Sequence, residues 1–165
     1  MIHKITTNAG RESLLAFGLL IPISCNIRNL ENGLRKMDQV VWSENEDGST
    51  GVPYSPQLFP QGIWGVGVPH LVDPKKDPSG YQQPYFIPTD AHCLVDVWTA
   101  VDGDGWSYKE KTSEKVMDWG YGLHFSLSRT TLGCLKVENK DKLLWLCEEI
   151  RKVMKAGDRV ILEVG

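Results

Sequence analysis

The chain has 165 residues, with 18 basic and 21 acidic side chains and a formal net charge of −3 at pH 7. This length suffices for one domain with an apolar core, and the nearly balanced charge excludes the basic footprint of a nucleic-acid-binding protein. Sixteen glycines, nine prolines and six tryptophans favour short strands and turns over a helical bundle. We therefore expect one mainly β domain of the α+β class over residues 1–165.

An apolar run near the N-terminus, residues 13–24 (SLLAFGLLIPIS), follows Lys4 and Arg11. It loosely resembles a signal peptide, but Glu12 adjoins it and the run is too short to cross a bilayer. We expect an internal strand or strand pair in an N-terminal extension over residues 1–25, and no membrane span.

The middle of the chain contains turn signals and short apolar runs in alternation. Residues 63–68 alternate glycine with apolar residues, as in a strand that another group approaches closely. The remaining expectations, in chain order, are a turn at Asn32–Gly33, a short strand over 39–42, a lid or binding loop over 70–88, a strand over 93–101 and an exposed charged segment over 109–115.

One helix is expected, late in the chain. Asn139 suits the N-cap, and Gly157 suits the position after the last turn. An apolar face recurs at helical spacing between them, formed by Leu143, Leu146, Cys147, Ile150 and Met154. A strand over residues 159–164 follows.

The four cysteines form no C-x-x-C pair and match no zinc-finger spacing. We expect thiols, three of them buried as small apolar residues, with a disulfide as the open alternative. His70, His92 and Asp96 match no zinc template either, so we expect no metal and no cofactor. The cysteines are Cys25, Cys93, Cys134 and Cys147.

One histidine and one cysteine stand out because of their spacing. His124 lies on an expected strand, and Cys134 follows ten residues later, after a polar loop. A thiol is nucleophilic as thiolate, and a neighbouring imidazole commonly removes its proton. Taken singly, each residue is more often a buried structural residue, so that alternative stays open for both.

Four segments in order resemble the L,D-transpeptidase (YkuD-like) catalytic domain. Residues 131–137 (TLGCLKV) resemble the sequence around that family's nucleophile, and residues 122–124 (GLH) resemble the strand that carries its base. Residues 59–64 (FPQGIW) resemble its Thr-Pro-x-Gly-x-Phe segment, and residues 156–162 (AGDRVIL) its closing strand. The resemblance covers residues 26–165 and implies a β-sandwich of mixed sheets with one packed C-terminal helix.

The resemblance also implies a reaction. Cys134 would be the nucleophile, forming a thioester with a peptidoglycan stem peptide, and His124 would be the base. The backbone N–H groups of Gly133 and Cys134 would form the oxyanion hole, and the carbonyl of Phe125 would orient the imidazole. The residues expected to contact the stem peptide are Arg129, Lys136, Ser126 and Thr131.

Three departures from the family pattern concern Phe125, Lys136 and a short loop between His124 and Cys134. The family usually has glycine and arginine at these two positions, and lysine cannot form the two parallel bonds that arginine makes with a carboxylate. The implied site of action is the periplasm or cell wall, reached with no convincing signal peptide, so cytoplasmic storage or delivery by another machine is the alternative. A second function stays open: an inactive structural or binding module of the same fold, such as a virion or secretion-machine component.

Overall fold

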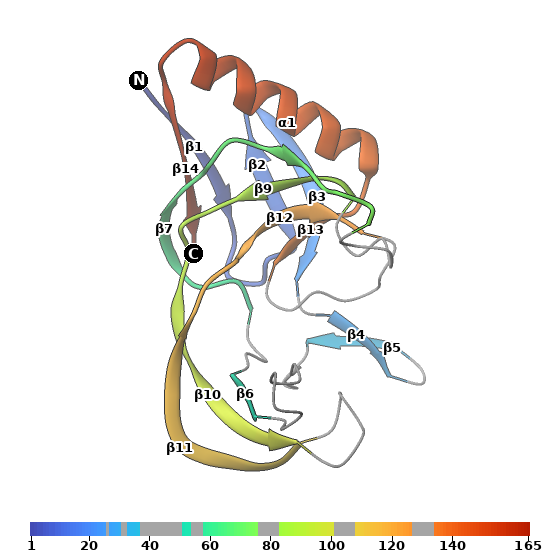
Figure 1. Ribbon diagram of the computed structural model, residues 1–165. Helices are drawn as coiled ribbons and strands as arrows, with labels where there is room; N and C mark the ends of the chain where they lie inside the picture. The colour runs from blue at the N-terminus through green and yellow to red at the C-terminus, as the bar shows by residue number, and fades with distance from the viewer. Residues whose placement is uncertain are drawn as a thin grey trace.

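The computed structural model describes residues 1–25, 27–30, 33–36, 51–53, 58–75, 83–100, 108–126 and 134–165. Within these ranges the chain forms a nine-stranded sheet in the order β7-β14-β1-β2-β3-β13-β12-β9-β8, two smaller sheets and one helix, α1 (Figure 1). The strands are β1 (Ile2–Thr7), β2 (Ser13–Ala16), β3 (Leu19–Cys25), β4 (Ile27–Leu30), β5 (Gly33–Lys36), β6 (Gly51–Pro53), β7 (Gly62–Gly65), β8 (His70–Leu71), β9 (Gln83–Pro88), β10 (Cys93–Ala100), β11 (Tyr108–Asp118), β12 (Gly122–Phe125), β13 (Leu135–Val137) and β14 (Arg159–Val164). The expected mainly β, α+β class is confirmed.

The N-terminal apolar run forms a strand pair, as predicted. β2 and β3 are antiparallel and are joined by a tight turn at Phe17 and Gly18, whose φ values are 49° and 80°. Positive φ at both turn positions matches the twist of a two-residue hairpin, and glycine adopts it at little cost. β1 pairs with β2 on one side and runs parallel to β14 on the other, with Ile2 opposite Arg159.

The helix was predicted correctly, including its ends. α1 spans Lys140–Lys155, and the Asn139 side chain accepts a hydrogen bond from the Lys142 backbone N–H. Gly157 has φ +89°, the left-handed conformation expected after the last turn. Its buried face consists of Leu143, Leu146, Cys147 and Ile150, while Met154 is only partly buried.

The α1 face packs on the nine-stranded sheet, with contacts to β14, β9, β12 and β13. At one end Arg151 lies 4.6 Å above the centre of the Tyr85 ring and donates a hydrogen bond to the Pro69 carbonyl. The apolar core therefore lies between the helix and one face of the sheet.

The expectation of a lid over 70–88 was wrong, whereas the charged segment over 109–115 is exposed at residues 113–115, as expected, but forms part of a strand. The segment over 70–88 contains the antiparallel strands β8 and β9, which are part of the large sheet and so are no simple lid. The charged segment over 109–115 lies within β11, which pairs with β10 in a long hairpin that extends away from α1 (Figure 1). Paired strands satisfy their backbone hydrogen bonds whatever the side chains are, so charged, solvent-facing residues fit such a hairpin.

β4 and β5 are antiparallel, with Leu30 opposite Gly33, so Gly33 begins a strand next to the predicted turn, and Asn32 lies outside the described residues. The strand expected over 39–42 lies outside the described residues. In the part of the chain that the structure describes, no helix is both long enough and apolar enough to span a membrane.

A buried arginine fastens the end of the N-terminal segment to two distant parts of the chain. The Arg11 guanidinium donates hydrogen bonds to the carbonyls of Ala9, Phe59 and Gly165. Burial lowers the pKa of this guanidinium from its usual value, and the nearby Cys25 opposes the shift. Three carbonyl partners repay the cost of burying the charge.

Candidate functional site

The two residues singled out in the sequence lie on neighbouring strands. β12 carries His124 and pairs in parallel with β13, which begins immediately after Cys134. In this register His124 lies opposite Lys136, two residues beyond Cys134. The fold therefore brings the expected base and nucleophile to the same part of one sheet.

His124 is completely buried. Its Nδ1 lies 3.3 Å from the carbonyl oxygen of Phe125, which is the contact that the family resemblance implied. The Phe86 ring stacks beside the imidazole with centroids 6.2 Å apart. A ring held in this way has a defined orientation, with Nδ1 directed at the backbone.

Cys134 is also buried, with 7% of its surface exposed. Its Sγ donates a hydrogen bond of 3.7 Å to the Gly120 carbonyl. Burial raises the pKa of this thiol to about 12; a backbone hydrogen bond from Gly122 opposes the rise, and nearby Cys25 and Asp118 add to it. In this state the thiol is neutral at physiological pH, and a neutral thiol is a poor nucleophile.

Close packing holds the start of β12 in place. A Cβ added to Gly122 would lie 2.3 Å from the Phe86 Cζ and 2.5 Å from the Ile87 carbonyl oxygen. Only glycine lets the backbone come this near to β9. The position of the Gly122 N–H, which lies near Cys134, depends on this absence of a side chain.

A hydrogen-bonded chain of polar groups adjoins the thiol. The Tyr121 hydroxyl donates to Asp118 at 2.6 Å, and the Cys93 Sγ lies 3.3 Å from the same hydroxyl. Burial raises the pKa of Asp118, and the hydrogen bond from Tyr121 partly opposes this. Thr89 donates to the Tyr121 carbonyl at 2.5 Å, which connects the chain to β9.

The other predicted site residues fall into two groups. Ser126 is buried directly after β12, and Lys136 has 12% of its side chain exposed and an ion pair with Glu138 at 3.7 Å. Lys136 therefore does not face solvent from its strand. Outside the described residues lie Arg129, Thr131 and Gly133.

The sequence reading missed the residues that surround the thiol: Gly120, Asp118 and Cys25. The glycines at 120 and 122 were the available signal, because closely spaced glycines before a strand indicate backbone in close contact with another group. Cys25 ends β3, where it is opposite Leu135, and its Sγ accepts a hydrogen bond from the Phe59 N–H at 3.2 Å. Its place beside Cys134 depends on strand pairing and could not be read locally.

All four cysteines are present as thiols, and Cys25, Cys134 and Cys147 are buried, as expected. No family model matches this chain, and the searches of curated proteins and of solved structures likewise find no match. The site has to be interpreted from its own geometry. Among the described residues, no three His, Cys, Asp or Glu side chains are grouped so that they could hold a metal ion.

Proposed function

We propose that this protein is a cysteine acyltransferase of the L,D-transpeptidase type that acts on peptidoglycan stem peptides. The observation that carries the proposal is the parallel pairing of β12, which contains His124, with β13, which begins immediately after Cys134. The contact between His124 Nδ1 and the Phe125 carbonyl supports it, because it leaves Nε2 as the nitrogen for proton transfer.

The reaction follows from these two side chains. Cys134 Sγ attacks the carbonyl carbon of an L,D amide bond, and its proton passes to His124 as the S–C bond forms. His124 then protonates the departing amine, which leaves a thioester on Cys134. An amine acceptor or water attacks the thioester next, giving a cross-link or a shortened stem peptide and restoring the thiol.

The raised pKa of Cys134 sets a condition on this mechanism. The thiol is neutral before substrate binds, so the proton has to be removed in the encounter with substrate rather than beforehand. Hydrogen bonds between catalytic groups are often long in unliganded enzymes and tighten when substrate binds. The proposal therefore requires substrate to bring Sγ and the His124 ring into hydrogen-bond contact.

Incubation with purified peptidoglycan, followed by mass analysis of the products, tests the proposal. New stem-peptide dimers indicate transpeptidation, and shortened stems indicate carboxypeptidase or endopeptidase activity. Cys134→Ala should abolish either product, whereas Cys93→Ala removes a partly exposed thiol from β10, a strand of another sheet, and should retain activity. Unchanged peptidoglycan with the wild-type protein would contradict the proposal.

The second candidate is an inactive structural or binding module, such as a virion or secretion-machine component. The burial of both His124 and Cys134 favours it, because a retired nucleophile packs as an ordinary core residue. In that case the Cys134→Ala variant would bind sedimented peptidoglycan, or another partner, as the wild-type protein does. Neither protein would alter the peptidoglycan chemically.

The proposed substrate places the site of action in the periplasm or cell wall. Delivery by another machine is one route to that compartment. Phage and effector enzymes that reach the cell wall in this way would cleave stem peptides rather than cross-link them. The product analysis above separates cleavage from cross-linking.

A further inference from the structure

Three aromatic rings form a continuous row at the surface, outside the His124 and Cys134 site. Trp119 stacks on His92, with centroids 4.4 Å apart and planes inclined by 27°. His92 in turn meets Trp64 in an edge-on contact at 5.2 Å. Trp119, at the outer end of the row, is 60% exposed. Most of this large indole is therefore open to water, next to the two rings with which it forms the row.

Backbone carbonyls hold two of the three rings in place. Trp64 Nε1 donates a hydrogen bond to the Pro60 carbonyl, and His92 Nδ1 lies 2.9 Å from the Asp90 carbonyl. The inner two rings are thus fixed by polar contacts, and the His92 ring supports the indole of Trp119 by stacking. The row is a rigid platform, which lowers the entropy that a ligand would lose on stacking against it.

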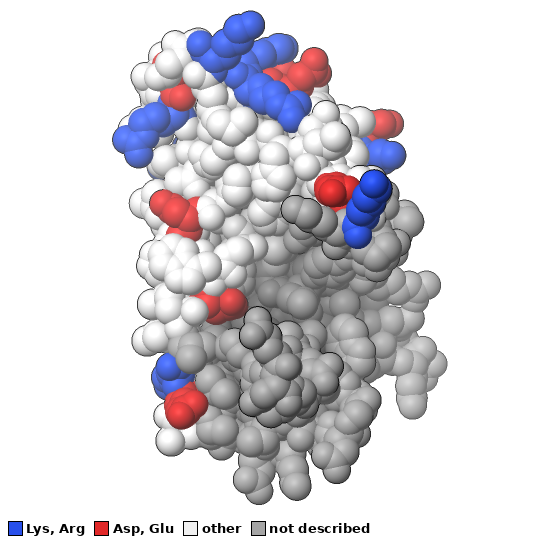
Figure 2. Space-filling model, viewed as in Figure 1, with Lys and Arg blue, Asp and Glu red and all other residues white. Residues whose placement is uncertain are grey.

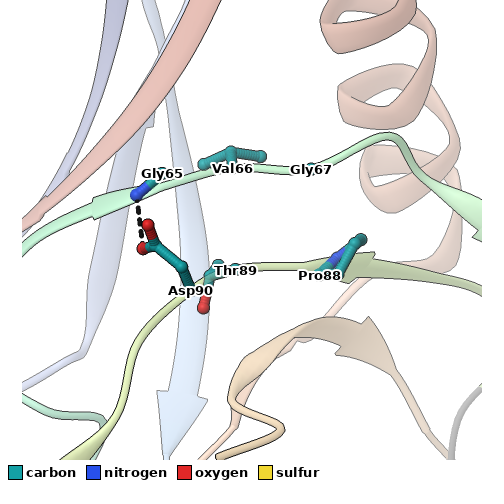
Figure 3. Close-up of a pocket in the computed structure, with 6 residues that line it drawn as sticks. All are labelled: Gly65, Val66, Gly67, Pro88, Thr89 and Asp90. Carbon is teal, nitrogen blue, oxygen red and sulfur yellow. Dashed lines mark hydrogen bonds between the residues drawn. The ribbon is translucent and has the colours of Figure 1, made fainter.

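A shallow hollow of about 340 Å³ lies between two chain segments and is lined by Gly65, Val66, Gly67, Pro88, Thr89 and Asp90 (Figure 3). Trp64 directly precedes the first of these segments, and His92 lies two residues after the second. It exists because Gly65 and Gly67 bear no side chains: a Cβ on either would lie about 3 Å from Asp90 or Pro88. Its floor is therefore bare backbone. Ile63, two residues before Gly65 on this strand, is 63% exposed.

The Asp90 carboxylate stands at the hollow. Its Oδ1 accepts a hydrogen bond of 2.6 Å from the Gly65 N–H, which orients the group, and the residue is exposed. A carboxylate held by one oxygen presents the other as a directed hydrogen-bond acceptor.

The charge distribution around the aromatic row and the hollow limits the class of ligand that can bind there. Lys and Arg gather over α1 and the adjoining ends of β1 and β14, whereas the margin over β7 and β9 is uncharged or acidic (Figure 2). In the sequence, Asp90 lies two residues before His92, and Asp118 immediately precedes Trp119. Nucleic acids and other polyanions would be repelled there, although aromatic rings alone would suit their bases.

We infer that the aromatic row, Asp90 and the hollow at Gly65 and Gly67 form a carbohydrate-binding site. It takes a glycan by stacking one sugar ring on Trp119 and by accepting a hydrogen bond from a sugar hydroxyl at Asp90. The C–H face of a pyranose is apolar and flat, so it matches the exposed indole, and its hydroxyls donate to a carboxylate. The bare backbone at Gly65 and Gly67 lets a further sugar unit approach the strand closely. None of these residues takes part in the proposed thioester chemistry.

Trp119 immediately precedes Gly120, and the Gly120 carbonyl accepts a hydrogen bond from the Cys134 thiol. The sugar site therefore lies near Cys134 in space. If the proposed function holds, the ligand is the glycan strand that bears the stem peptides, and only this identity rests on that proposal. The recognition of sugar itself can be tested without any peptide, so the two can fail separately.

Binding of chitotetraose, cellotetraose and maltotetraose to the full chain is measured by isothermal titration calorimetry and saturation-transfer NMR. We expect at least one of these to bind, with saturation transfer to the ring protons of the sugar. Trp119→Ala should weaken binding about tenfold or more, whereas Trp119→Phe keeps an aromatic face and should stay within about threefold. Chitotetraose as the preferred ligand would connect the site with the proposed peptidoglycan substrate.

Asp90→Asn provides an independent variant, since it removes the charge of an exposed residue and leaves the platform intact. It should weaken sugar binding by about threefold to tenfold. Leu20→Ala, which removes an exposed apolar side chain from β3, is the matched control and should bind as the wild type does. Circular dichroism establishes that each variant is folded.

Three results would overturn the inference. The first is that none of the tetrasaccharides binds at millimolar concentration. The second is that folded Trp119→Ala or Asp90→Asn binds them as the wild type does. The third is that tetramethylammonium displaces the sugar and binds more tightly, which would make the row a site for organic cations.

Discussion

The face of α1 that packs on the sheet and the part of β12 and β13 around His124 are both buried, but they are built from different kinds of residue. Beneath the helix the buried side chains are apolar, as at Leu143, Leu146 and Ile150. Around β12 and β13 the buried residues include His124 and Ser126, with Ser24 opposite Lys136 on the next strand. Burying polar groups costs free energy unless each is hydrogen-bonded.

The two regions differ in how closely they follow the rules of stable packing. The helix-covered region behaves as packing, in which any apolar residue of suitable volume would serve. The region around β12 and β13 uses glycine and polar side chains where apolar ones would be more stabilising. Functional sites commonly depart from the rules of stable packing in this way, and three experiments examine the difference.

The largest expected effect concerns the thiol in the polar region. With a pKa of about 12, against 9.0 as its ordinary value, Cys134 has about a thousandfold less thiolate at neutral pH than an unfolded thiol. Iodoacetamide should therefore alkylate Cys134 about a thousandfold more slowly in the native protein than in urea, as measured by peptide mass spectrometry.

The pH dependence has a definite sign. Because the folded pKa is raised, burial of the neutral thiol stabilises the protein fully below pH 9, and this contribution is lost as pH rises towards 12. The alkylation rate at Cys134 should increase with each pH unit up to that range. Cys93, which is partly exposed, is the internal control, and labelling of Cys134 faster than Cys93 at pH 7 would contradict the buried thiol.

The next effect is on the helix-covered region. Leu146→Ala should lower the free energy of unfolding by about 3 kcal/mol, because it removes a fully buried side chain and leaves a cavity between α1 and the sheet. Urea denaturation measures the change. Leu20→Ala removes the same atoms from an exposed position and should change stability by less than about 0.5 kcal/mol. Equal effects of the two substitutions would show that α1 is not packed as described.

The smallest effect returns to β12. Gly122→Ala should cost about 2 kcal/mol, because the added Cβ collides with the Phe86 ring and with the Ile87 carbonyl. Gly120→Ala is the matched control: its added Cβ meets nothing within 4 Å, but φ is +92°, so strain alone should cost about 1 kcal/mol. An unchanged free energy of unfolding in Gly122→Ala would mean that β12 does not lie this close to β9.

The sequence predicted those elements whose signals are local. The helix has a cap, a periodic face and a terminal glycine within one short segment, and the β2–β3 pair is a single apolar run. β11 was missed because its side chains are mostly charged, and β8 and β9 because prolines surround them. A strand of this kind is defined by the partner strand, which lies elsewhere in the chain.

The same reasoning separates what could be predicted of the site. The sequence pattern predicted that His124 lies on a strand and contacts the Phe125 carbonyl, because both features involve adjacent residues. The burial of Cys134 depends on Gly120 and on β3 and β12, which meet it only in the folded sheet. Whether the pair performs acyl transfer stays a prediction that the peptidoglycan experiment tests.

The parallel pairing of β1 with β14 has a consequence for the order of folding. Ile2 lies opposite Arg159, so the N-terminal strand gains this neighbour only after all of the residues in between have been synthesised. Until then β1 has β2 on one side and an unpaired edge on the other, and such edges readily pair with other chains. Contacts this distant in sequence also form slowly. During synthesis, therefore, the open edge of β1 is exposed to pairing with other chains until β14 has formed.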